Sequence, residues 1–204
     1  MNSLEFPGSA KLVETIDAAM AEGSIRGIAD CLRNSLSSLI QSNEVKLPAC
    51  VLETIQGHYA RRELYQSNEY GYCVVAMTWG PGQGTAIHDH CGMWCVEGVW
   101  QGALEVVQYE RLSDQDGLYR FQPVGSILAS AGSAGSLIPP HEYHTIRNPS
   151  ENATAVSVHV YAGRLDNCAV FRPKGAELCY ERCDRQLGLD PIPDSPEASR
   201  QVAE

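Results

Sequence analysis

The sequence contains no run of about eighteen apolar residues, the length that a membrane-spanning helix requires. Basic residues are also scarce: 15 Lys and Arg stand against 25 Asp and Glu, and the net charge is −10. This charge disfavours nucleic acid and anionic membranes as partners. Because neither a Gly-x-Gly-x-x-Gly fingerprint nor a Walker loop is present, no nucleotide cofactor is expected. The N-terminal residues also lack the basic-then-apolar layout of a secretion signal, which predicts a cytoplasmic protein.

Length and composition are those of an ordinary globular protein. The chain has 204 residues, of which 44% are hydrophobic and 20% are charged. Such a length predicts a single domain with a sizeable core. The eight cysteines are scattered through apolar segments. Without a secretion signal, this distribution predicts reduced thiols rather than a disulfide framework.

The pattern of apolar residues divides the chain into three parts. Between Lys11 and Ile40 these residues recur at helical spacing, with breaks expected at Gly23 and Gly27. Further along, short apolar runs alternate with Gly, Pro, Asn and Asp, as in an antiparallel double-stranded β-helix. We therefore expect a mainly β fold, with two or three helices covering one side of a barrel. The expected parts are a helical region over about 1–49, a β-barrel over about 50–171 and a C-terminal tail over about 172–204.

Two histidines follow the segment Val74–Trp79, which reads as a buried strand, and the glycine-rich turn after it. His88 and His90 are two residues apart on an extended segment, so both imidazoles leave the same face. Two convergent imidazoles are a common start of a transition-metal site. A later proline-containing turn offers two candidates for a third ligand, His141 and His144.

Two frames in the sequence have a specific spacing, namely Gly82-(x5)-His88-x-His90-(x4)-Cys95-(x6)-Gly102 and Pro139-(x4)-His144-(x3)-Asn148. They resemble the two motifs of the cupins, in which Glu usually occupies the position of Cys95. Cys at that position narrows the resemblance to the thiol dioxygenases. The chain is most similar to the type I cysteine dioxygenases, from about Tyr59 to Cys168. The resemblance implies a cupin double-stranded β-helix, that is, a jelly-roll barrel.

The same resemblance assigns a metal and its ligands. It implies one Fe(II) ion bound by three histidines, His88, His90 and His144. His144 is preferred because His141 takes a position that the second motif normally gives to Gly. Three neutral imidazoles leave Fe(II) its full charge of +2, which suits an anionic thiolate. Asp89, Glu97 and backbone carbonyls are candidate acceptors that fix the orientation of the imidazoles.

The apolar segment that ends at Tyr161 alternates in polarity. Three valines share one face, and Ser157, His159 and Tyr161 share the other. The polar face either meets solvent at the barrel surface or points inward to the metal as a hydrogen-bonded Ser-His-Tyr relay. The resemblance to cysteine dioxygenase favours the inward orientation and implies catalytic roles for the three residues.

A thioether bond is a further implication of the resemblance. In the cysteine dioxygenases that carry this cysteine, residues at the positions of Cys95 and Tyr161 become covalently joined beside the iron. Cys91, directly after the ligand pair, departs from the family's usual residue and is a competing thiol.

Three arginines are candidates to bind a carboxylate group of the substrate. The segment from Tyr59 to Arg62 resembles the one that offers an Arg to the substrate carboxylate in cysteine dioxygenases, which implies substrate-binding roles for Tyr59 and Arg61. A guanidinium binds a carboxylate through two parallel hydrogen bonds. Arg62 and Arg164 remain alternatives for this contact, and Arg164 leaves open a second carboxylate.

The resemblance thus implies a non-haem iron dioxygenase of cysteine catabolism that converts L-cysteine and O2 to cysteine sulfinate. Oxidising a thiol to a sulfinate removes four electrons, all that dioxygen requires, so no further redox cofactor is expected. The expected partners are a small thiol and O2, and the expected state is a monomer or weak homo-oligomer. Alternatives are a dioxygenase for 3-mercaptopropionate or mercaptosuccinate, a metal-binding cupin without catalysis, and a hydrolase or isomerase with Zn or Mn.

Overall fold

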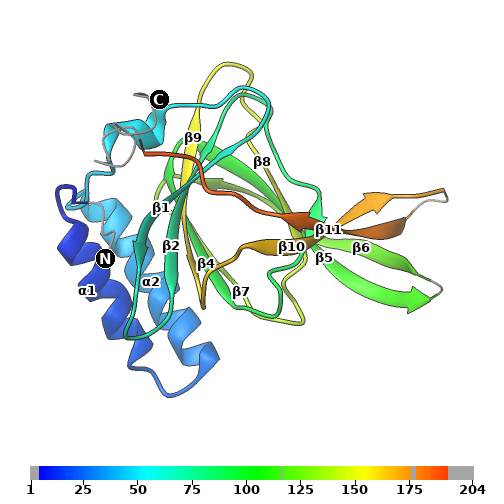
Figure 1. The fold of residues 1–204 in the computed structure, drawn as a ribbon, viewed down its shortest axis with the longest axis horizontal. Coiled ribbons are helices and arrows are strands. Elements are labelled where there is room, and N and C mark those ends of the chain that lie inside the picture. Colours follow the sequence, from blue (N-terminus) through cyan, green and yellow to red (C-terminus); the bar gives the residue numbers. More distant parts are fainter. Residues whose placement is uncertain (1–4, 116, 176–177, 193–204) are drawn as a thin grey trace, which may run out of the picture.

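The computed structural model of the protein describes residues 5–115, 117–175 and 178–192. Two helices pack against one side of a strand-rich body, and two long hairpins project from the opposite side (Figure 1). Neither helix has the length and apolarity that crossing a bilayer requires. The fold is the expected mainly β cupin barrel with N-terminal helices.

The helices are α1, Ser9–Met20, and α2, Ile25–Ser42, followed by a short 3-10 helix, η1, over Ala49–Leu52. The helical structure is interrupted near Gly23, as expected, but Gly27 lies inside the first turn of α2. The expected break there is wrong because Ser24 caps the helix: the Gly27 N–H donates to Ser24 Oγ at 3.1 Å.

Five strands form the first sheet in the order β1-β2-β9-β4-β7. Their bounds are Ala60–Gln66 (β1), Cys73–Trp79 (β2), Ala155–Tyr161 (β9), Cys95–Gln101 (β4) and Ala134–Leu137 (β7). The other six strands form a closed ring in the order β10-β11-β6-β5-β8-β3. Their bounds are Asn167–Pro173 (β10), Cys179–Gln186 (β11), Leu118–Ser130 (β6), Ala103–Gln115 (β5), His144–Arg147 (β8) and Ile87–His88 (β3).

The five-stranded sheet is buried on both faces. Its outer face packs on α1 and α2, and its apolar residues form one cluster with Leu12, Ile16 and Leu36 of the helices. The helices come so close that a Cβ on Gly98 of β4 would lie 2.7 Å from the Ile40 side chain. Only glycine fits there without a shift of the Ile40 and Leu36 side chains. Alternate residues of the same strands face the barrel interior.

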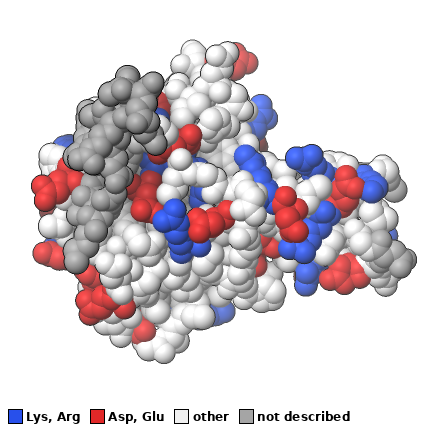
Figure 2. Space-filling view, viewed as in Figure 1, with Lys and Arg blue, Asp and Glu red and all other residues white. Residues whose placement is uncertain are grey.

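The six-stranded ring extends beyond residue 171, whereas the sequence pattern predicted that a C-terminal tail begins there. β10 continues to Pro173, and β11 pairs with it and with β6. This boundary is wrong because β11 belongs to a projecting hairpin and carries mostly polar residues, so it lacks the apolar alternation of a core strand. Ion pairs such as Lys174–Glu181 and Arg182–Asp184 lie along it, and Figure 2 shows basic and acidic side chains interspersed over these hairpins.

Candidate metal centre

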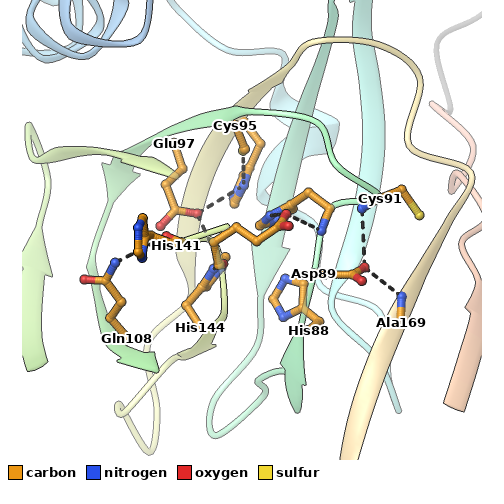
Figure 3. A network of polar contacts seen from close by, with 12 residues as sticks. His88, Asp89, Cys91, Cys95, Glu97, Gln108, His141, His144 and Ala169 are labelled. Atoms are coloured by element: carbon orange, nitrogen blue, oxygen red, sulfur yellow. Dashed lines mark hydrogen bonds and ion pairs between the residues drawn. The ribbon is translucent and has the colours of Figure 1, made fainter. Parts of the chain in front are cut away.

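Three imidazoles converge inside the barrel (Figure 3). His88 ends β3 and His144 begins β8, and the two residues are direct cross-strand partners. His90 follows two residues after His88. One nitrogen from each ring can be chosen so that all three lie within 4.8 Å of one another, which is close enough for a single ion. His141, the alternative third ligand, is exposed and stands outside this cluster.

Hydrogen bonds fix the orientation of two of the rings. His88 Nδ1 lies 3.1 Å from the Ala86 carbonyl oxygen, and His144 Nδ1 lies 2.9 Å from that of Glu142. Because a carbonyl only accepts, each Nδ1 carries the proton, and the Nε2 lone pair is left for the cluster. His144 Nε2 is buried and has no hydrogen-bond partner among the described residues.

Burial keeps these imidazoles neutral. It lowers the pKa of each of the three rings to about 3, and the neighbouring histidines add to the effect. Neutral rings are the form that binds metal. A neutral three-imidazole set with an unpartnered, buried Nε2 fits a transition-metal ion.

Glu142 supports the site, although the sequence did not single it out. Its Oε2 accepts from the His90 backbone N–H at 2.8 Å and lies 3.3 Å from His90 Nδ1. Its place two residues before His144 was the available signal, since alternate residues of an extended segment share a side. Asp89, expected to orient an imidazole, instead accepts from the backbone N–H groups of Cys91 and Ala169, and so ties the turn to β10.

The polar residues of β9 face the interior, and all seven residues of this strand are buried. Ser157 Oγ accepts from Trp79 Nε1 at 2.9 Å and lies 2.8 Å from His159 Nε2. The other nitrogen of His159 lies 3.4 Å from Glu97 Oε2. Within the described residues, no hydrogen bond joins His159 to Tyr161. The expected Ser-His-Tyr relay therefore runs in another direction, from Trp79 toward Glu97, because the second imidazole nitrogen points at β4.

Cys95 and Tyr161 are directly opposite each other on the neighbouring strands β4 and β9, and both are buried. Tyr161 has a second cysteine, Cys73, opposite it on β2. Cys91 is exposed, and its thiol contacts Asn167. All eight cysteines lie among the described residues, and none of them is in a disulfide.

The adjacent arginines of β1 lie on opposite faces. Arg61 is buried, and its guanidinium donates to the carbonyls of Gly188 and Leu165 at 3.0 and 3.1 Å. Arg62 is buried on the other side and donates to Thr78 and to the Glu53 carbonyl. Burial raises the pKa of Tyr161 well above its usual value, and the charge of Arg61 opposes that shift. Of the two arginines, Arg61 is therefore the one on the side of Tyr161.

Two further basic residues differ in their surroundings. Arg164 is exposed and bonded to Asp166 at 2.9 Å. Arg185 of β11, which the sequence analysis did not consider, lies with its guanidinium 5.9 Å from the ring centre of Tyr59. Tyr59 itself stacks on Trp79 at 4.5 Å. Burial raises the pKa of Tyr59, and the charges of Arg185 and Arg61 oppose this shift, so both cations lie near one aromatic ring.

A cavity of about 200 Å³ also reaches the site. Its walls are mainly apolar, with Leu104, Val106 and Ile146 among them. Its titratable lining consists of Glu97, His144 and His159 among the described residues, whereas Tyr59, Arg61 and Tyr161 are not part of it.

Comparison with known proteins identifies the family of this chain. The family model "Cysteine dioxygenase type I" matches residues 41–174. Cysteine dioxygenase type 1 of Rattus norvegicus is 26% identical over 169 residues, which cover 72% of this chain and 79% of that protein. The Danio rerio protein of the same name is 24% identical over 110 residues, and the chain spans about half (54%) of its length. Among solved structures, a Thermus thermophilus protein aligns over 59% of this chain and 98% of its own, with 22% identity and a TM-score of 0.45. Because the family model matches well over half of the sequence, the chain belongs to the cysteine dioxygenase type I family.

Proposed function

We propose that the protein is a non-haem iron thiol dioxygenase that converts L-cysteine and O2 to cysteine sulfinate. The observation that carries the proposal is the three-imidazole cluster beside a cross-strand Cys95–Tyr161 pair inside one barrel. The reaction balances without another reductant, because thiol plus O2 gives sulfinic acid with both oxygen atoms retained. A passive metal-binding cupin needs neither the pair nor the buried β9 row.

The roles of the residues follow from their positions. When bound, Fe(II) supplies the redox centre at which thiol sulfur and dioxygen combine. Two N–H groups of Arg61 bond to carbonyls, which leaves three of the five guanidinium donors for a substrate carboxylate. Tyr161 is buried in the inner cluster of the barrel, and its hydroxyl forms no hydrogen bond to another described residue. It is therefore available to hydrogen-bond to the substrate.

The Cys95–Tyr161 thioether is part of the proposal. Its formation removes one hydrogen from the thiol and one from the ring, with O2 as the oxidant. The direct cross-strand register supports it. After aerobic turnover, mass spectrometry of tryptic peptides should show the two segments joined with the loss of two hydrogens. An unlinked pair after many turnovers, or linkage through Cys73 or Cys91, would count against this bond.

Arg185 favours a second candidate, a thiol with two carboxylates such as mercaptosuccinate. Its guanidinium lies over Tyr59 and has no ion pair or hydrogen bond to any residue of the described ranges. Arg61 and Arg185 could then each bind one carboxylate. Arg164 is less suited to this role, because Asp166 already pairs with it at the surface.

Oxygen uptake with a panel of thiols tests the proposal. The panel contains L-cysteine, 3-mercaptopropionate, mercaptosuccinate and cysteamine, and metal content is measured on the same sample. We expect one iron per chain and the highest kcat/KM with L-cysteine. A tenfold preference for mercaptosuccinate that disappears in Arg185→Ala would establish the second candidate. Full metal loading without oxygen uptake on any thiol would contradict both.

A further inference from the structure

Glu97 is a carboxylate inside the barrel that the proposed reaction does not use. It lies on β4 two residues after Cys95, and its side chain is only 13% exposed. Its Oε2 lies 3.4 Å from His159 Nδ1 and 3.9 Å from His144 Nε2 (Figure 3). The same atom is buried and makes no hydrogen bond of good geometry to a described residue. The carboxyl group is also not a member of the three-imidazole cluster, so it is a neighbour of the ligands.

The hydrogen bonds around His159 have a direction. Indole Nε1 of Trp79 is only a donor, so Ser157 Oγ accepts from it. Ser157 is buried, and its own hydroxyl proton has one partner among the described residues, His159 Nε2 at 2.8 Å. Ser157 therefore donates to Nε2. A neutral imidazole that accepts at Nε2 carries its proton on Nδ1. This nitrogen lies 3.4 Å from Glu97 Oε2 and 4.0 Å from Cys95 Sγ, and the carboxylate is the stronger acceptor of the two.

The opposite arrangement leaves a buried group unpaired. If a protonated Glu97 donated to His159 Nδ1, the ring proton would move to Nε2 and the Ser157 hydroxyl would have no acceptor. An unpaired buried donor costs about 1–3 kcal/mol. An ionised Glu97 instead completes the chain from Trp79 through Ser157 and His159 to the carboxylate.

We propose that Glu97 is a positioning residue that accepts the Nδ1–H of His159 and holds this ring in one tautomer, with neither ring nitrogen hydrogen-bonded to Tyr161. The His159 and Tyr161 rings are stacked, with centres 5.9 Å apart and planes 18° from parallel. The Tyr161 hydroxyl is thereby left for substrate, and this consequence for catalysis rests on the proposed dioxygenase function. Glu97 also places a negative charge beside His144 without becoming a ligand.

The tautomer of His159 can be measured in protein expressed without iron. Long-range ¹H–¹⁵N correlation spectra, recorded at mildly alkaline pH, distinguish a protonated from an unprotonated ring nitrogen, and His159→Gln assigns the signals. We expect Nδ1–H in the wild type. Glu97→Leu should populate the Nε2–H form and move both ¹⁵N shifts, whereas Glu97→Gln, whose carbonyl still accepts, should restore the wild-type pattern.

Glu110→Leu is the matched control, since it removes an exposed carboxylate from β5, a strand of the other sheet, and should leave the His159 shifts unchanged. Wild-type shifts in Glu97→Leu, or an Nε2–H ring in the wild type, would overturn the proposal. Metal content gives an independent check: Glu97→Leu should retain about one Fe(II) per chain, and loss of the metal would make Glu97 a ligand instead. Because the tautomer is read in metal-free protein, failure of the dioxygenase assignment would leave the NMR result intact.

Discussion

The two faces of the five-stranded sheet have the same burial and opposite chemistry. On the outer face, valines of β9 pack against α1 and α2 in a cluster made of apolar side chains. On the inner face, the alternating residues carry a hydroxyl, an imidazole and a phenol. Nearby, Glu97 Oε2 and His144 Nε2 have no hydrogen-bond partner within the described part of the chain. One strand thus contributes apolar packing through one face and the side chains of the candidate site through the other. Substitutions on the two faces should therefore separate stability from metal binding and turnover.

The largest effect is expected for His144 on the inner side. His144→Ala should remove both the metal and turnover, because it deletes a buried ligand whose Nε2 has no other partner among the described residues. Metal analysis after anaerobic iron loading, together with oxygen uptake, measures the effect. His141→Ala is the matched control, since that ring is exposed, and it should retain both properties. If His141→Ala lost the metal and His144→Ala kept it, the third ligand would be misassigned.

The inner face should also make the metal-free protein sensitive to acid. Burial lowers the pKa of His88, His90, His144 and His159 from about 6.5 to about 3. Their stabilising contribution is complete above pH 6.5 and is lost as the pH falls toward 3, because only the unfolded chain binds protons there. Burial raises the pKa of Glu97 from 4.5 to about 7, so its contribution is complete below pH 4.5 and is lost as the pH rises through 7.

The four histidines take up protons on unfolding, and Glu97 alone releases one. The free energy of unfolding should therefore fall as the pH falls from 6 to 4. The slope is about 1.4 kcal/mol per pH unit for each net proton that unfolding takes up. Urea unfolding at several pH values measures it, and His159→Gln should reduce the slope by about one proton. A flat profile in the metal-free protein would show that these rings are solvated.

On the outer face, Leu36→Ala should lower stability without changing the chemistry. Leu36 is fully buried in α2 against β4, and its truncation leaves a cavity that costs about 2–5 kcal/mol. Urea unfolding measures this cost. Metal content and kcat at a temperature where the variant is folded should match the wild type. A variant with native stability but impaired metal loading would break the distinction between the faces.

The smallest of these effects concerns the neighbouring arginines Arg61 and Arg62. Loss of a charge-assisted carboxylate contact costs about 1.5–3 kcal/mol, or roughly ten- to a hundredfold. Arg61→Ala should lower kcat/KM for L-cysteine by that factor and affect cysteamine less, because cysteamine has no carboxylate. Arg62→Ala should lower the free energy of unfolding and leave the ratio between the two thiols unchanged. Equal losses for both thiols in Arg61→Ala would make Arg61 a structural residue.

Local patterns predicted the parts of the fold that depend on periodicity. Helical spacing gave both helices, and alternation gave the strands whose faces differ in polarity, such as β9. β11 was missed because both of its faces are rich in polar residues in a projecting hairpin. The break assigned to Gly27 was wrong because a side-chain cap three residues earlier outweighs the low helix propensity of one glycine.

The sequence by itself determined which residues form the candidate metal site: the spacing of His88 and His90 and the second motif with His144 are properties of the chain. Tertiary structure decided the partners of those residues. Glu142 reaches His90, and Glu97 reaches His159, only because strands distant in sequence are paired in a particular register. The direction of the hydrogen bonds, the choice between Arg61 and Arg62, and the approach of Arg185 to Tyr59 arise in the same way. Local spacing fixes which face a side chain occupies, whereas its contacts depend on which strand closes the barrel beside it.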